Sequence, residues 1–182
     1  MSFGPDNWSL INHKARPRLR RPLDHPASVL SVRPVKPGDR VIQIVTIGFW
    51  AEHVVKLYKL EGLKHIGDIT GLPHAPRSVL LWKFGADDTS RLHALVGTAN
   101  GNLLIAKLEV HGPQLNIKSR RTLSLGTRPV DIEGFSGTGE HVMTCGSRAI
   151  VLSWEEDRER IAYHRISTKV YPYYPSSAGW PR

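Results

Sequence analysis

Short apolar or alternating runs follow one another along the chain, separated by turn-forming residues. The best marked example is LVGTANGNLLIAKLE (95–109), in which two apolar runs flank Asn100-Gly101. An Asn-Gly pair between such runs favours a β-hairpin, because both central residues of a type I′ turn need a positive φ. No window sustains the i, i+3, i+4, i+7 spacing of an amphipathic helix. The pattern therefore predicts an all-β chain.

This hairpin belongs to a unit that occurs three times. Gly48, Gly97 and Gly146 stand 49 residues apart, and each lies between two strand-like runs. A further run precedes each pair and a fourth follows it. The expected strands are 26–32, 41–48, 53–60 and 63–69, then 76–84, 91–97, 102–109 and 115–125, then 128–135, 140–146, 149–154 and 160–167. Four antiparallel strands in about fifty residues match one β-propeller blade. We predict a partial β-propeller of about three blades, with a twelve-stranded β-sandwich as the alternative.

The predicted blades occupy residues 25–170, between a basic flexible N-terminal tail (1–24) and a C-terminal tail (171–182). A closed propeller typically has at least four blades. Uncovered blade faces expose apolar surface and unpaired strand edges, which recruit more protein. We therefore expect another chain, or an oligomer, to supply the remaining blades.

The formal net charge of +9 is concentrated in the N-terminal tail. The segment HKARPRLRRP (13–22) has six basic side chains and no acidic one. Apart from the histidine, these are Lys14, Arg16, Arg18, Arg20 and Arg21. Such a run contacts nucleic-acid phosphate or an acidic partner, directs nuclear import, or forms a solvated linker.

No run of eighteen apolar residues is present, so no membrane partner is expected. The first ten residues lack the basic and apolar regions of a secretory signal. A single cysteine, Cys145, cannot form an internal disulfide. These features predict a cytosolic or nuclear compartment. We expect a nuclear location, and an additional cytoplasmic one stays open.

Motifs for catalysis or metal binding are missing from the sequence. There is no CxxC, HExxH or GxSxG, and GFSGTGEH (134–141) has Glu140 where a phosphate-binding loop requires lysine. The acidic run EEDRER (155–160) includes two arginines that partly offset its carboxylates, as in a surface turn. We therefore predict no enzyme activity, no metal site and no cofactor.

Candidate functional residues are those suited to protein interfaces. Trp50 stands in the turn IGFWAEH (47–53) beside Glu52, and Arg77 opens the second unit. Aromatic and arginine side chains dominate the energetics of protein interfaces. The alternative for Trp50 is that its ring folds over its own blade.

Several phrases together resemble a known family. IGFW (47–50), PRSVL (76–80) and LNIKSRRTLSLGTRP (115–129) are similar to segments of the second β-propeller of the large damaged-DNA-binding protein family, the propeller adaptors of cullin-4 ubiquitin ligases. The likeness covers roughly residues 25–170. The superfamily also contains splicing factor 3b and cleavage-and-polyadenylation factor subunits, which share the phrase at 125–129.

The resemblance implies a non-enzymatic scaffold linked to the DNA damage response. In that family the second propeller is the one that docks the cullin. The implied partners are a cullin-like protein and other ligase subunits. It also implies that Trp50 and Arg77 lie on the cullin-facing side. Three alternatives stay open: an RNA-processing scaffold, a nucleic-acid binder that uses the basic tail, and a non-functional remnant.

Overall fold

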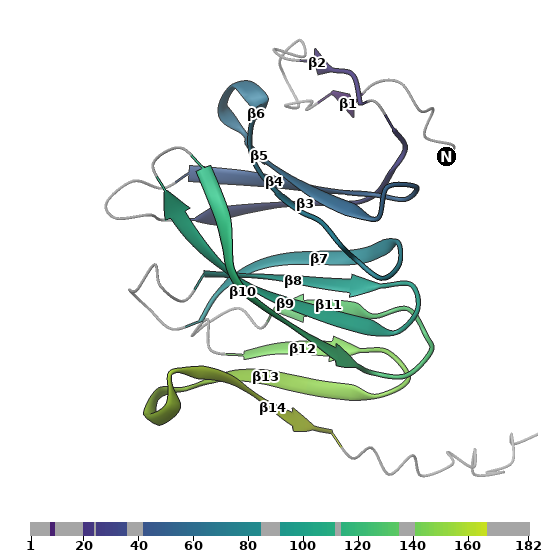
Figure 1. Ribbon diagram of the computed structural model, residues 1–182, viewed down its shortest axis with the longest axis vertical. Helices are drawn as coiled ribbons and strands as arrows, with labels where there is room; N and C mark the ends of the chain where they lie inside the picture. Colours follow the sequence, from purple (N-terminus) through teal and green to yellow (C-terminus); the bar gives the residue numbers. More distant parts are fainter. Residues whose placement is uncertain are drawn as a thin grey trace, which may run out of the picture.

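The computed structural model describes residues 8–9, 20–23, 25–35, 42–84, 92–111, 114–134 and 141–166. Within these ranges, three four-stranded antiparallel sheets follow one another along the chain (Figure 1). The described ranges contain no α-helix, only 3-10 turns at Glu61–Leu63 and Glu156–Arg158. The prediction of an all-β partial propeller with three blades is confirmed.

Each blade is a simple meander, in which strands adjacent in the chain are adjacent in the sheet. The first blade contains β3 (Ala27–Val35), β4 (Ile42–Phe49), β5 (Val54–Lys59) and β6 (Lys64–Ile69). The second contains β7 (Pro76–Lys83), β8 (Leu92–Thr98), β9 (Asn102–His111) and β10 (Gln114–Ser124). The third contains β11 (Asp131–Gly134), β12 (His141–Cys145), β13 (Ala149–Glu155) and β14 (Arg160–Arg165). A short pair, β1 (Trp8–Ser9) and β2 (Arg20–Arg21), precedes them.

The blades pack face to face through apolar side chains that alternate along each strand. On β5, Val55 and Leu57 enter the core shared with the second blade, whereas Val54 and Tyr58 point to the opposite side. The central strand of the middle blade, β8, is buried over its whole length. A period of two therefore serves two cores at once, which is why these strands read as nearly continuous apolar runs.

The first two repeat glycines, Gly48 and Gly97, lie where one blade meets the start of the next. A Cβ atom at Gly48 would lie 2.8 Å from Cγ of Pro76, and one at Gly97 would lie 2.3 Å from the Val130 carbonyl oxygen. At Gly146, in the third blade, the nearest described atom would be 3.3 Å away. A side chain at the first two positions would therefore hold neighbouring blades apart.

The two outer faces of the three-blade stack differ in chemistry. On the first blade, Phe49 and Tyr58 belong to an apolar cluster against which Leu23 packs. On the third blade, the register aligns one outward row across the four strands: Glu133, Met143, Val151 and His164. The ends of this row are exposed and its centre is half-buried. The first face is thus an apolar core, and the second a mixed polar surface.

Candidate protein-interaction surface

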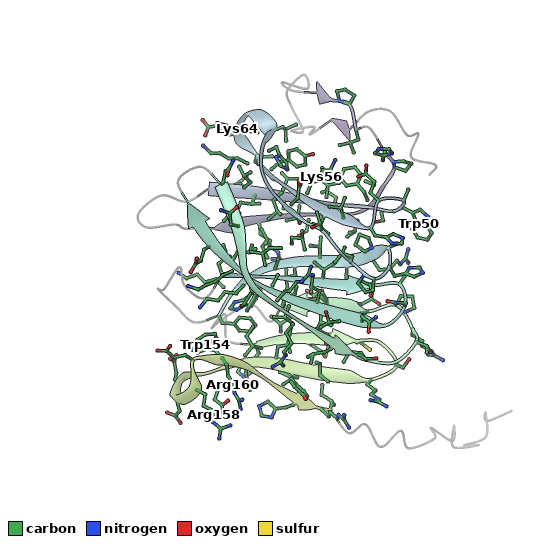
Figure 2. The ribbon with its side chains drawn as sticks, in the orientation of Figure 1. Trp50, Lys56, Lys64, Trp154, Arg158 and Arg160 are labelled. Atoms are coloured by element: carbon green, nitrogen blue, oxygen red, sulfur yellow. The ribbon has the colours of Figure 1, made fainter. Side chains whose placement is uncertain are left out.

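The turns between the second and third strands of each blade lie at one end of the molecule, together with the connections between blades (Figure 1, right). Trp50 lies at this end (Figure 2). Its position follows from the alternation of β4, because Phe49 turns into the core and is 2% exposed. Trp50 begins the following turn and remains 53% exposed. Its backbone N–H is 3.4 Å from the Pro26 carbonyl oxygen, which accepts the hydrogen bond.

The Glu52 carboxylate contacts two basic side chains. One carboxylate oxygen is 2.8 Å from Nε2 of His25, and the other is 3.7 Å from Nζ of Lys56. The Lys56 ammonium also lies 5.0 Å from the centroid of the Phe49 ring, a cation–π contact. Glu52 therefore braces the turn that carries Trp50.

Arg77 is exposed at the start of the second blade. The pairing of β7 with β8 shifts register between Pro76 and Ser78, which makes Arg77 the extra residue of a β-bulge. A bulge bends the strand and re-aims its side chains. Because Pro76 also packs against the end of β4, Arg77 and Trp50 come from adjacent blades at the same end of the molecule.

A pair of histidines joins the Trp50 turn to the connection between the blades. The rings of His53 and His74 are stacked, with centroids 5.4 Å apart and planes 15° apart. His53 adopts a left-handed backbone conformation, with φ of 51°. The Nδ1 atom of His74 accepts a hydrogen bond from the backbone N–H of Ala75 at 2.9 Å. Neither histidine stands in a motif, so the sequence carries no signal for this contact.

The basic tail is largely outside the described residues. Lys14, Arg16 and Arg18 all lie there. Arg20 and Arg21 form β2, which pairs with Trp8–Ser9, and their side chains are not described. Contact with nucleic acid by these five residues therefore stays a prediction.

The described part of the chain was also compared with the requirements of a metal site and of a membrane span. No three His, Cys, Asp or Glu side chains gather there in a way that could hold a metal ion. No described helix has the length and apolar character needed to cross a membrane. The arrangement at the Trp50 end offers an exposed ring, an exposed guanidinium and a braced backbone, which are suited to contact with another protein.

Comparison with known proteins agrees with the fold. A family model described as the RSE1/DDB1/CPSF1 second beta-propeller matches residues 18–175. DNA damage-binding proteins 1a and 1b of Arabidopsis thaliana are each 28% identical to the chain over 149 residues. DNA damage-binding protein 1 of Solanum lycopersicum has the same identity. The matched region is 81% of this chain and 13% of each relative.

Proposed function

We propose, because this chain belongs to the RSE1/DDB1/CPSF1 second beta-propeller family, that it is a non-enzymatic protein-interaction module of the DNA damage-binding protein type. The chain spans 13% of the length of the relatives that it matches. It would therefore supply one docking surface of a larger assembly. The relatives' name favours a nuclear role in the response to DNA damage.

The proposed docking site is the surface formed by Trp50 and Arg77, and the proposed partner is a cullin-like helical protein. The observation that carries this proposal is the 53% exposure of Trp50 on a turn held by its own blade. Such a ring can be buried by a partner at little cost in conformational entropy, because the turn is already ordered. Arg77 adds a charged group that can pair with an acidic side chain of the partner.

Binding of the full chain to the N-terminal region of a cullin-4 protein, measured by calorimetry, tests the proposal. We expect Trp50→Ala to weaken binding about 30-fold, because truncation of a central interface aromatic costs ~2 kcal/mol or more. The single variant Arg77→Ala should also weaken cullin binding. Tyr163→Ala is the matched control, since Tyr163 is 47% exposed on β14 of another blade. No binding by folded protein would refute the partner, and equal losses in all three variants would refute the site.

Glu52 has a different expected role. Its carboxylate is occupied by His25 and Lys56, so it would position the turn without contacting the partner. Exposed ion pairs contribute about 0–1 kcal/mol. Glu52→Gln should therefore weaken cullin binding less than fivefold, and a loss as large as that of Trp50→Ala would show direct contact.

An RNA-processing scaffold is the second candidate, because the family description also names RSE1 and CPSF1. The relatives that this chain matches favour the first candidate, since they carry the name DNA damage-binding protein. Affinity purification of the tagged chain separates the two functions. Recovery of splicing or cleavage-factor subunits, without a cullin, would favour the RNA-processing role.

A further inference from the structure

A cavity of about 190 Å³ opens between the second and third blades. Its lining residues include Trp154 and Arg160, which lie at the end of the molecule opposite Trp50 (Figure 2). The second blade contributes residues of β8, β9 and β10, and the third contributes the end of β13, the start of β14 and the turn between them. The cavity is therefore separate from the surface proposed for docking.

A β-bulge in β10 builds the wall formed by the second blade. The register shifts between Ile117 and Ser119, so side chains that would alternate toward the first blade turn toward the third. Ser119 then lies opposite Lys107, and Arg121 lies opposite Ile105. Paired residues of antiparallel strands share a face. The bulge thus brings Arg121 to the face of the second blade that carries Lys107 and the apolar residues facing the third blade.

The third blade supplies an ordered wall opposite. Trp154 pairs across the strands with Ile161, and its indole Nε1–H donates a hydrogen bond to Glu156 Oε2 at 3.3 Å. Its ring centroid is 6.2 Å from that of His93. Arg160 donates from Nε to Glu155 Oε2 at 2.8 Å, which leaves its terminal nitrogens as further donors. The cavity therefore combines an apolar surface with fixed hydrogen-bond donors.

Positive charge dominates the lining. Four basic side chains border the cavity against one acidic side chain: Lys107, Arg120, Arg121 and Arg160 against Glu159. The Arg121 guanidinium lies 5.3 Å from the centroid of the Tyr163 ring. Within the described chain, neither Lys107 nor Arg121 has a carboxylate at ion-pairing distance. Arg120 is already committed, because its Nη1 donates to the Thr70 carbonyl oxygen at 3.2 Å. The lining thus carries an excess of positive charge.

We propose that this cavity binds a phosphate monoester carried on a short side chain, such as the phosphothreonine of a partner peptide. A phosphomonoester carries a charge of about −1.5 to −2 at pH 7 and three strong acceptor oxygens. Guanidinium and ammonium groups together provide forked and point-charge donors for such a group. The apolar surfaces of Ile105 and Ile161 would contact the aliphatic part of the side chain.

The size of the cavity favours this ligand over nucleic acid. Pockets for drug-sized molecules have volumes of about 300–1,000 Å³, whereas this one measures about 190 Å³. Single-stranded nucleic acid is instead bound in open grooves that follow several phosphates of the backbone. Each phosphodiester also carries only one charge. A single recess with several cations is better matched to one doubly charged group.

The test uses the full chain and three probes: a tripeptide Gly-phosphothreonine-Gly, its unphosphorylated form and a single-stranded oligothymidine. Nuclear magnetic resonance titrations follow the indole Nε1–H signal of Trp154 at about 0.1 M salt. We expect a saturable shift with the phosphopeptide at a Kd of roughly 1 mM, and binding of the unphosphorylated peptide at least about tenfold weaker. Equal shifts with both peptides would overturn the proposal. Tighter binding of the oligothymidine would overturn it in favour of nucleic acid.

Two variants and one control locate the binding. Lys107→Gln and Arg121→Gln should each weaken phosphopeptide binding about tenfold. Arg158→Gln removes a cation from the same β13–β14 turn, but its side chain is 63% exposed and does not line the cavity. The Arg158→Gln variant should bind the phosphopeptide as the parent chain does. Thermal unfolding checks that each variant is folded. Equal losses in the control, or full binding by both folded cavity variants, would overturn the site.

Discussion

Gly97→Ala tests the packing of the blades directly. A methyl group at this position would lie 2.3 Å from the Val130 carbonyl oxygen and 2.4 Å from the Ser78 hydroxyl oxygen. These two atoms are themselves joined by a hydrogen bond of 2.6 Å, from the hydroxyl to the carbonyl. The added atom would therefore enter the contact between the second and third blades, and relief requires backbone movement.

The expected loss of stability follows from three contributions. Overpacking of a close-packed site costs about 1–3 kcal/mol. Loss of the hydrogen bond between Ser78 and Val130 adds about 1 kcal/mol. The reduced freedom of alanine in the unfolded chain offsets about 0.4–1 kcal/mol. The net loss is ~1–3.5 kcal/mol, which lowers Tm by roughly 2–14 °C for a chain of this length.

Chemical and thermal unfolding, followed by circular dichroism, measure this loss. Gly146→Ala is the matched control, because it occupies the same place in the repeat with its nearest described neighbour at 3.3 Å. We expect its stability to change by about 1 kcal/mol or less. If Gly97→Ala were as stable as Gly146→Ala, the third blade would not start against the second as described, and the reasoning would fail.

Three other predictions concern the Glu155 turn, two buried threonine hydroxyls and the basic tail. Arg160 donates a hydrogen bond to Glu155 and so lowers the pKa of that carboxyl below its ordinary value of 4.5. The ionised pair of Glu155 and Arg160 should therefore stabilise the turn above pH 4.5 and lose its effect as the pH falls through the lowered pKa. A carboxyl NMR titration of Arg160→Gln should show the pKa of Glu155 return toward 4.5. Thr98→Val should cost about 1–3 kcal/mol in denaturant unfolding, because the buried Thr98 hydroxyl forms hydrogen bonds within its turn. Thr144→Val should instead be neutral or stabilising, because the buried Thr144 hydroxyl has no hydrogen-bond partner among the described residues. If the basic tail contacts single-stranded nucleic acid, deletion of 13–22 should abolish binding and its salt dependence, whose slope is about −0.7 per phosphate contact.

Much of the fold could be predicted from the sequence because each blade is built from local signals. The twelve expected strands all form, and the sheets pair in chain order. The turn at Asn100-Gly101 forms as expected, with Gly101 at a φ of 86°. The family resemblance is also confirmed by the match over residues 18–175. Hairpins and meanders join neighbours in the chain, so a pattern with period two is nearly sufficient to describe them.

The candidate sites were less predictable because they depend on contacts between blades. The exposure of Trp50 is consistent with its place in a turn, but its functional role stays a prediction. Glu52 looked like a partner-binding acid, and only the structure reveals its ion pairs with His25 and Lys56. The stack of His53 on His74 likewise needs two blades to meet. No local pattern encodes such contacts.

The cavity was hidden for a more specific reason. A strict alternation along β10 assigns Ser119 and Arg121 to the same face as Ile117. The extra residue at the bulge, Lys118, reverses this assignment from Ser119 onward. Propensity does not reveal a bulge of this kind, because its position is set by pairing with β9. A one-residue shift thus converts a cationic outer strand into part of a binding recess.

The two proposed sites belong to different blade interfaces, and the repeat glycines separate them. Close packing at Gly48 joins the first and second blades, which carry Trp50 and Arg77 respectively. Close packing at Gly97 joins the second and third blades, whose interface holds the cavity. Gly97 itself lies beside the turn between β8 and β9, at the end of the blades opposite the cavity. The two proposed sites therefore lie at different blade interfaces and at opposite ends of the blades, so side-chain variants at one site should leave binding at the other unchanged.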